Sequence, residues 1–318
     1  MTKIADPVVT AAQNLKHKNR QKWLINWELY LLLMIPVIYI LVFKYYPMYG
    51  AQIAFKDFRV TKGILGSDWV GIKHFKNFFS NYQFSRILTN TLGINIYMLI
   101  AGFPAPILLA ILLNYLPSRQ FRKTVQMVTY TPYFISTVVI VAMVIQFTSI
   151  RSGLINNVIA AFGGNRIDMM GNKDLFWSIY VWSGIWQGAG YGSIIYIAAL
   201  SSVDPELHEA AVVDGASLIK RIWHIDLPSI APTIVILLIL RCGNIINVGF
   251  EKTLLMQNSL NLARSEVIST YTYKVGLASS TNQYSYASAI GLFTSVINFV
   301  MLISVNTIAR KLNKTSLF

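Results

Sequence analysis

The sequence contains one cysteine, Cys242, and four histidines in 318 residues. A single cysteine excludes an intramolecular disulfide, and the scattered histidines offer no metal-ligand spacing. We therefore predict no metal site and no bound cofactor in this chain. The histidines are interpreted as loop or interface residues.

Charged residues are also scarce, at 13% of the chain, whereas 54% of the residues are hydrophobic. A soluble domain carries about a quarter of charged residues, so this composition indicates an integral membrane protein. The formal net charge is +14. Because the inner loops of membrane proteins collect Lys and Arg, and no basic stretch alternates with aromatic residues, the charge does not indicate nucleic-acid binding.

Long apolar runs give the predicted fold, an all-α polytopic membrane protein with six transmembrane helices. A helix needs about 20 apolar residues to cross a bilayer. The runs are continuous rather than alternating, which favours helices over strands, and the first has no small-residue cleavage site of a signal peptide. The predicted spans lie at about 28–46, 87–116, 122–148, 175–200, 230–250 and 284–309.

Basic residues predict the orientation of these spans. They gather in the N-terminal tail, in the turn around Arg119–Lys123 and in the C-terminal tail. Six crossings place all three clusters on one side, which the positive-inside rule assigns to the cytoplasm. The loop 204–228 falls on the same side.

This topology divides the chain into four predicted parts. They are a basic cytoplasmic tail (1–27), a first span with an extracytoplasmic loop (28–86), a core domain (87–311) and a C-terminal tail (312–318). The first outer loop is rich in lysine and aromatic residues, and we expect it to form a small cap with short amphipathic helices.

The sequence has no nucleotide-binding G-x-x-x-x-G-K-[ST] motif of its own. Its acidic residues avoid the centres of the apolar runs, which argues against proton or Na⁺ coupling. No catalytic dyad at membrane depth indicates an enzyme. The energy for transport is therefore expected to come from another polypeptide.

The loop "PELHEAAVVDGASLIKRIWHIDLP" is amphipathic and lies between two apolar runs. Asp204 and Pro205 are typical of a helix start, and Gly215 allows the chain to turn. A second short helix is predicted to follow and to end at Pro228, where the next span begins. The pattern predicts a helix–turn–helix elbow, with a helix resting on lipid as the alternative.

Within this loop, "EAAVVDG" (Glu209–Gly215), nine further residues and "IDLP" (Ile225–Pro228) match the pattern EAA-x3-G-x9-I-x-L-P. The match resembles the coupling loop of permease subunits in binding-protein-dependent ABC importers. The resemblance implies a type I ABC importer permease fold and docking of this loop on a cytoplasmic ATPase. The implied coupling positions are Glu209, Ala210, Ala211, Asp214, Gly215, Ile225, Leu227 and Pro228.

Other stretches resemble the permeases for oligosaccharides and polysaccharide fragments, among them "TYTPYFIS" and "INVGFEKTLLMQN". This resemblance implies a second homologous permease, two ATPase subunits that bind the ATP, and an extracytoplasmic sugar-binding protein. It also implies a multi-pass protein of the bacterial cytoplasmic membrane, with both termini in the cytoplasm. The alternatives are a permease for another solute, such as a peptide or phosphate, or a secondary carrier or channel.

Polar residues in two spans are candidates for the substrate path. Gly184, Gly188 and Gly192 share a face that is typical of helix packing. Sugars are bound by aromatic faces and amides, which favours Trp186, Gln187 and Tyr191 in the same span.

The next span carries Arg241, Asn244 and Asn247 near one side of the helix. A membrane-buried arginine costs at least ~2.5–3.5 kcal/mol on insertion scales, so Arg241 needs a partner. That partner is either an anionic group on the substrate or a group on the second permease.

Overall fold

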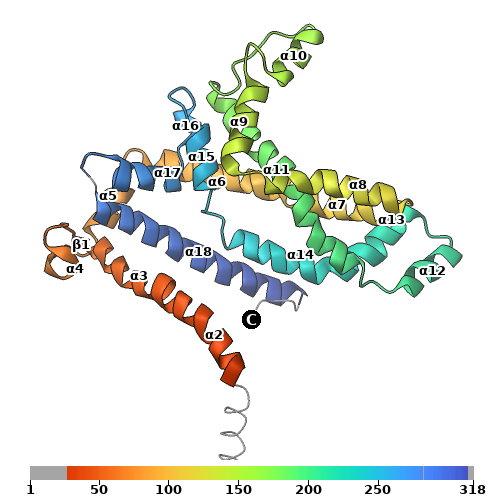
Figure 1. Ribbon diagram of the computed structural model, residues 1–318, viewed down its shortest axis with the longest axis horizontal. Coiled ribbons are helices and arrows are strands. Elements are labelled where there is room, and N and C mark those ends of the chain that lie inside the picture. The colour runs from red at the N-terminus through yellow and green to blue at the C-terminus, as the bar shows by residue number, and fades with distance from the viewer. Residues whose placement is uncertain (1–26, 282, 314–318) are drawn as a thin grey trace, which may run out of the picture.

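The computed structural model describes residues 27–281 and 283–313. The predicted tails at 1–27 and 312–318 lie outside this range, apart from the helical ends at residues 27 and 312–313. The described chain is mostly helical, as expected (Figure 1). The described residues also form one hairpin of two-residue strands, β1 (Lys56–Asp57) and β2 (Asp68–Trp69).

The helices follow in this order. The first half of the chain forms α2 (Trp27–Ile40), α3 (Tyr46–Met48), α4 (Gly63–Gly66), α5 (Lys73–Phe79), α6 (Phe84–Tyr97), α7 (Pro104–Asn114), α8 (Arg119–Tyr130), α9 (Thr137–Thr148) and α10 (Leu154–Ala161). The second half forms α11 (Phe176–Leu200), α12 (Pro205–Val213), α13 (Leu218–Arg221), α14 (Leu227–Cys242), α15 (Phe250–Met256), α16 (Leu262–Ser265), α17 (Ile268–Tyr273) and α18 (Tyr284–Asn313).

Four continuous helices in the described part are long and apolar enough to cross a membrane: Trp27–Phe55, Phe84–Asn114, Leu218–Cys242 and Tyr284–Lys311. A fifth crossing requires a bent pair of helices. Helix α11 has 25 residues, but its Gly, Ser, Gln and Tyr content keeps it out of this group. Four or five spans are thus found, and six remains a prediction.

The prediction of one continuous span at 122–148 is wrong. Residues Arg119–Phe134 and Thr137–Thr148 form two helices that meet at 103°. Pro132 lies in the last turn of the first helix, and Ser136 caps the second by accepting a hydrogen bond from the amide of Val139. The apolar run continues through this bend, so hydropathy alone did not reveal it.

The prediction that Pro228 separates two helices is also wrong. Helix α13, the π-helical segment Ile222–Asp226 and α14 form one continuous helix, which ends at Cys242 instead of near residue 250. Proline lacks an amide donor and crowds the preceding turn, and a π-helical turn accommodates both effects. The same arrangement recurs at Leu41–Tyr45 before Pro47 and at Met98–Gly102 before Pro104.

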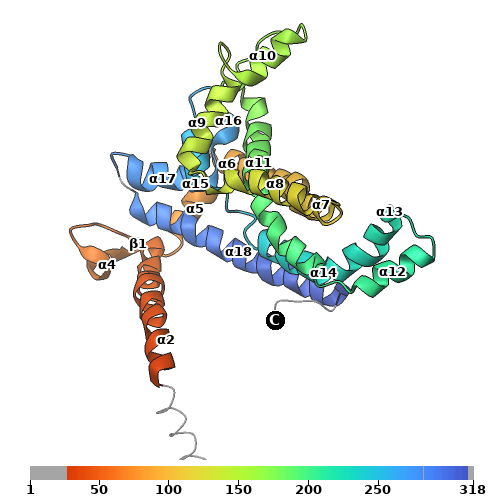
Figure 2. The same ribbon diagram turned by 45° about the vertical axis from the view of Figure 1, so that its right-hand side comes forward.

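Helix α11 is the centre of the packed structure. Its two ends belong to different buried clusters: Tyr180 and Val181 pack with α6, α9 and α15, and Tyr196 and Leu200 pack with α7 and α14. A third cluster, around Phe78, joins α5, α6, α17 and α18. Both views place α5 and α17 near one end of α18, and the loop α12–α13 towards the other end (Figures 1 and 2).

Helix α2 stands apart from these clusters. It extends away from the other helices in both views, and none of its residues is buried (Figures 1 and 2). Its sequence WELYLLLMIPVIYI is apolar on every side. A helix of this kind is stable when lipid or another membrane subunit covers it.

Candidate functional site

The predicted elbow forms, and its first helix begins where expected. Asp204 is the N-cap of α12, and its Oδ1 accepts a hydrogen bond from the amide of Glu206 at 3.0 Å. Pro205 occupies the first turn, where a missing amide donor costs nothing. The start of the elbow is therefore set by residues that are adjacent in sequence.

The turn of the elbow centres on Gly215, whose φ is +74°. The amide of Gly215 donates to the carbonyl of Val212 at 3.0 Å, and that of Ala216 donates to the carbonyl of Ala211 at 2.8 Å. This pair of bonds is a Schellman motif, which satisfies the free carbonyls at a helix end. Because a side chain at positive φ is disfavoured, glycine makes this turn without strain.

The elbow exposes large apolar side chains beside its turn and along both limbs. Val213 is 87% exposed and Trp223 is 65% exposed. The other large apolar side chains exposed there are Leu207, Val212, Leu218 and Ile219. An apolar patch with this exposure indicates an interaction surface.

The predicted coupling residues divide into two groups on this elbow. Glu209, Ala210, Asp214, Gly215 and Pro228 are exposed. Ala211, Ile225 and Leu227 are half-buried, and Leu227 packs against the cluster of α7, α11 and α14. The first group is available to a partner, whereas Leu227 of the second group attaches the elbow to the membrane helices.

A buried carboxylate, Asp226, holds the two limbs of the elbow together. It is fully buried, its Oδ2 accepts a hydrogen bond from the Tyr115 hydroxyl at 2.6 Å, and its Oδ1 lies 3.3 Å from His208 Nε2. The second contact is at ion-pair distance without hydrogen-bond geometry. His208 lies in α12 and Tyr115 directly follows α7, so three separate segments meet at this one side chain.

Two further contacts complete this anchor. The Arg221 guanidinium lies 5.9 Å from the centre of the Tyr115 ring, and the His208 ring packs edge-on against that ring. Burial and the hydrogen bond to Asp226 raise the pKa of Tyr115 to about 12, which keeps the phenol protonated as a donor. The contact between Tyr115 and Asp226 was not predicted from the sequence. The available signal was a lone acidic residue two positions before Pro228, in an apolar segment.

The candidate substrate residues form two separate groups. Arg241, Asn244 and Asn247 line one pocket of about 230 Å³, together with Asn95 and Tyr180. Asn247 Nδ2 donates to Asn244 Oδ1 at 3.2 Å. Arg241 also borders a second pocket of about 320 Å³ along α11, and it has no ion-pair partner among the described residues.

Gln187 and Tyr191 lie against the bend between α8 and α9 instead, whereas Trp186 lies against α9 itself. Gln187 Nε2 donates to the carbonyl of Ile135 at 3.5 Å, and Tyr191 stacks on Tyr133 with ring centres 3.8 Å apart. Trp186 lines an apolar pocket with residues of α9. The chain by itself therefore does not bring all six candidates onto one surface.

The glycines of α11 contact different neighbours. A side chain at Gly184 would collide with Met98, and one at Gly192 would press on Pro106, which agrees with close helix packing. Gly188 faces open space at the second pocket.

Near Gly184, the buried Lys252 donates a hydrogen bond to the carbonyl of Tyr180 at 3.1 Å. Its amine also lies 4.7 Å from the centre of the Tyr180 ring. Burial lowers the pKa of Lys252 to about 8.

No group of three or more His, Cys, Asp or Glu side chains in the described part could hold a metal ion. The arrangement contains instead several apolar helices, a polar pocket and a largely apolar pocket that both border Arg241, and an anchored elbow with an exposed tip. These features define the membrane subunit of a transporter.

The chain belongs to the family of binding-protein-dependent transport system inner membrane components, which matches residues 102–314. It is a multi-pass membrane protein and the pore-forming permease of an ABC importer, and it is not an enzyme. It is 41% identical to Protein LplB of Bacillus subtilis, over 98% of this chain and 97% of that protein. It is 40% identical to the polygalacturonan/rhamnogalacturonan transport system permease protein YteP of the same organism, over 98% of each chain.

A solved structure has the same fold. It belongs to a bacterial ABC transporter involved in the import of the acidic polysaccharide alginate. The TM-score is 0.85 at 38% identity, and the match covers 93% of this chain and 99% of that one. The same transporter has been solved in complex with an alginate pentasaccharide-bound periplasmic protein.

Proposed function

We propose that this chain imports oligosaccharides or polysaccharide fragments across a bacterial cytoplasmic membrane, together with a second homologous permease. A periplasmic binding protein delivers the sugar, and two cytoplasmic ATPase subunits bind and hydrolyse the ATP. Identities of 40–41% to LplB and YteP over nearly the whole chain support the sugar class. The observation that carries the proposal is the anchored elbow with its exposed apolar tip.

The proposed topology has six crossings. Helix α11 and the bent pair α8–α9 supply the two that accompany the four long helices. Six crossings put both termini and the elbow in the cytoplasm, and the end of the fold that contains α5 and α17 outside. The basic residues Arg119, Arg122 and Lys123 at the start of α8 support this orientation.

The elbow transmits motion in this proposal. The tip docks on the ATPase through Glu209, Ala210, Asp214 and the exposed apolar side chains. When ATP draws the two ATPase subunits together, Asp226 carries the displacement of α12 directly to the end of α7. A rigid link is required because a flexible loop would absorb the displacement before it reached the pore.

The cargo path in this proposal passes Arg241, Asn244 and Asn247. Two amides and a guanidinium recognise hydroxyl and carboxylate groups. Arg241 has no ion-pair partner within the described chain, which leaves it free for an acidic sugar. A role of Trp186, Gln187 and Tyr191 in cargo contact remains a prediction.

The proposal is tested by reconstituting the complex with its binding protein in liposomes. ATPase activity and uptake are measured with neutral and acidic oligosaccharides. We expect stimulation by sugar and uptake only when ATP and both ATPase subunits are present. Sugar transport by the chain alone, without ATP, would contradict the proposal.

A further inference from the structure

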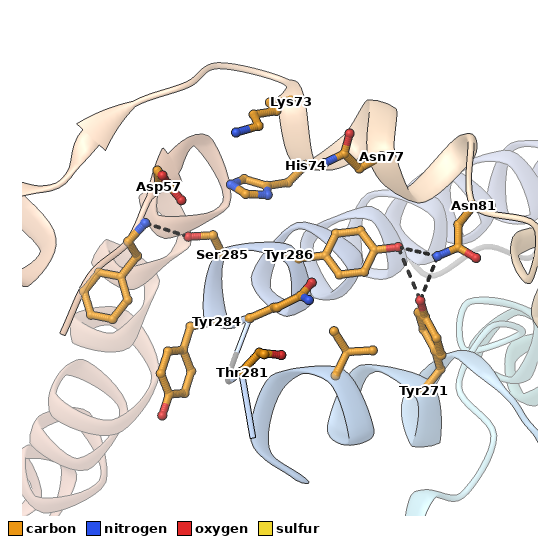
Figure 3. A pocket seen from close by; sticks show the side chains of 13 residues that line it. Asp57, Lys73, His74, Asn77, Asn81, Tyr271, Thr281, Tyr284, Ser285 and Tyr286 are labelled. Carbon is orange, nitrogen blue, oxygen red and sulfur yellow. Dashed lines mark hydrogen bonds between the residues drawn. The ribbon is translucent and has the colours of Figure 1, made fainter. Parts of the chain in front are cut away.

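A polar pocket of about 520 Å³ opens at the end of the fold opposite the elbow. Side chains from α5, the end of the β1 strand and the start of α18 line it (Figure 3). Lys73, His74 and Asp57 lie on one side, and Tyr284 and Thr281 lie on the opposite side (Figure 3). The volume falls in the range of about 300–1,000 Å³ that small-ligand sites occupy.

One wall of this pocket is a fixed group of three polar side chains. Asn81 Nδ2 donates to the hydroxyls of Tyr271 at 3.0 Å and Tyr286 at 3.4 Å, and the two hydroxyls are 3.5 Å apart (Figure 3). Asn81 is itself held, because its Oδ1 accepts a hydrogen bond from the amide of Gln83. These contacts join α17, α18 and the segment before α6.

The two phenols have more donor capacity than this group uses. Both hydroxyl oxygens accept from Asn81, and one of the two hydroxyls donates its hydrogen to the other. The hydroxyl that accepts this bond keeps its own hydrogen, which has no acceptor among the described residues. Burial and the neighbouring Tyr286 hydroxyl raise the pKa of Tyr271, so its phenol stays protonated. A buried hydroxyl normally finds an acceptor. The pocket therefore offers a donor to a ligand.

The opposite wall is also held in place. His74 Nε2 donates to the carbonyl of Lys56 at 3.1 Å, because a carbonyl oxygen only accepts. The Ser285 hydroxyl accepts a hydrogen bond from the amide of Phe58 at 2.9 Å, which ties α18 to the hairpin. The site is thus positioned by bonds between distant segments, before any ligand arrives.

Several groups on the rim remain available. The described residues provide no hydrogen-bond or ion-pair partner for the side chains of Lys73, Asn77 and Asp57, which all line the pocket. Tyr284 packs edge-on against Phe58 and adds an aromatic surface. The lining contains one lysine, Lys73, and one aspartate, Asp57, so their opposite charges leave it close to electrically neutral.

We infer that this pocket binds a neutral sugar unit at the outer mouth of the permease. The hydroxyls of a sugar both donate and accept hydrogen bonds, and they match the amide, ammonium, carboxylate and phenol groups that line this pocket. The aromatic rings of the pocket can cover the apolar face of a sugar ring. The balanced charge favours a neutral unit over a uronate. The inference rests on the proposed sugar cargo, and it adds a binding site separate from the Arg241 pocket.

The test uses the full complex in nanodiscs, without ATP and without binding protein, titrated calorimetrically with arabinotriose and with trigalacturonate. We expect arabinotriose to bind. Lys73→Ala and Asn77→Ala remove exposed side chains without breaking internal hydrogen bonds, and each is expected to weaken the affinity for arabinotriose about fivefold to tenfold. Lys76→Ala on the same helix but outside the pocket leaves the affinity unchanged. Tyr286→Phe weakens binding while retaining the ring.

Four results would overturn the inference. The first is that arabinotriose does not bind, and the second is that arabinotriose binding is lost in Asn247→Ala but kept in Asn77→Ala. The third is that only trigalacturonate binds. The fourth is that Asn77→Ala abolishes docking of the binding protein although no sugar binds to the complex. The outcome is independent of the transport assay, because no ATP is used. Failed uptake of every sugar contradicts the proposed function, whereas failed titration contradicts only this pocket.

Discussion

His208 in α12 and Asp226 at the base of the elbow face each other, with Nε2 and Oδ1 3.3 Å apart. The same carboxylate binds the hydroxyl of Tyr115, which is 111 residues away in sequence. One fully buried side chain thus joins both limbs of the elbow to the end of α7. This connection fixes the base of the elbow to the end of α7, as the proposed transmission of motion requires.

The first prediction concerns this anchor. Tyr115→Phe removes one donor from the buried Asp226 carboxylate, and a hydrogen bond to a charged group contributes about 1.5–3 kcal/mol. We expect lower thermal stability of the purified complex and reduced sugar-stimulated ATPase activity. Tyr133→Phe is the matched control, since the Tyr133 hydroxyl has no hydrogen-bond partner among the described residues. Unchanged stability and coupling in Tyr115→Phe would remove Asp226 from the mechanism.

The second prediction concerns the turn of the elbow. Gly215→Val places a branched side chain at a φ of +74°, which costs about 1–2 kcal/mol. We expect a folded permease that keeps basal ATPase activity in the complex but loses its stimulation by sugar. Gly50→Val serves as the control, because Gly50 lies in the helical segment Tyr49–Phe55, is not at positive φ, and a Cβ there meets no atom within 4 Å. Full stimulation in Gly215→Val would show that the turn need not be rigid.

The third prediction concerns Arg241 and the charge of the cargo. Arg241→Gln keeps hydrogen-bonding capacity but removes the positive charge. We expect uptake of acidic oligosaccharides to fall about tenfold or more, while uptake of neutral ones changes little. Arg264→Gln, at an exposed ion pair with Asp174, is the control. Equal loss for both cargo classes would assign Arg241 to the second permease instead.

The fourth prediction is a pH dependence of stability from Lys252. Its pKa is about 8 in the folded chain and 10.5 in the unfolded one, so the unfolded state binds more protons between these values. Stability therefore rises as the pH increases from about 8 to 10.5, by up to about 3 kcal/mol. Thermal unfolding in detergent across this range should show the rise, and Lys252→Met should lack it. An identical pH profile for both proteins would contradict this assignment.

Local features of the elbow could be predicted from sequence because their bonds join near neighbours. Asp204 caps a helix whose amides lie two residues away, and Gly215 closes a turn with carbonyls three to five residues away. The predicted end at Pro228 was wrong for the opposite reason. Proline propensity describes an isolated helix, whereas a π-helical turn before Pro228 lets this helix continue.

Six residues were predicted to lie on one substrate path, and in the structure they form two separate groups. Gln187 faces the carbonyl of Ile135 at the bend between α8 and α9, whereas Arg241 lies in a pocket with Asn95 and Tyr180. The spacing of residues along a helix predicts which side chains share a face. It does not state what packs against that face, and the 103° bend depends on tertiary contacts.

The sequence by itself determined that this protein is a helical membrane protein with a helix–turn–helix elbow, because long apolar runs and short capping motifs act over one helix or one turn. Only the tertiary structure decided that Asp226 meets Tyr115, and that Asn81 joins Tyr271 to Tyr286. Those contacts join residues 111 to 205 positions apart. Their positions depend on how whole helices pack, and no local pattern encodes that.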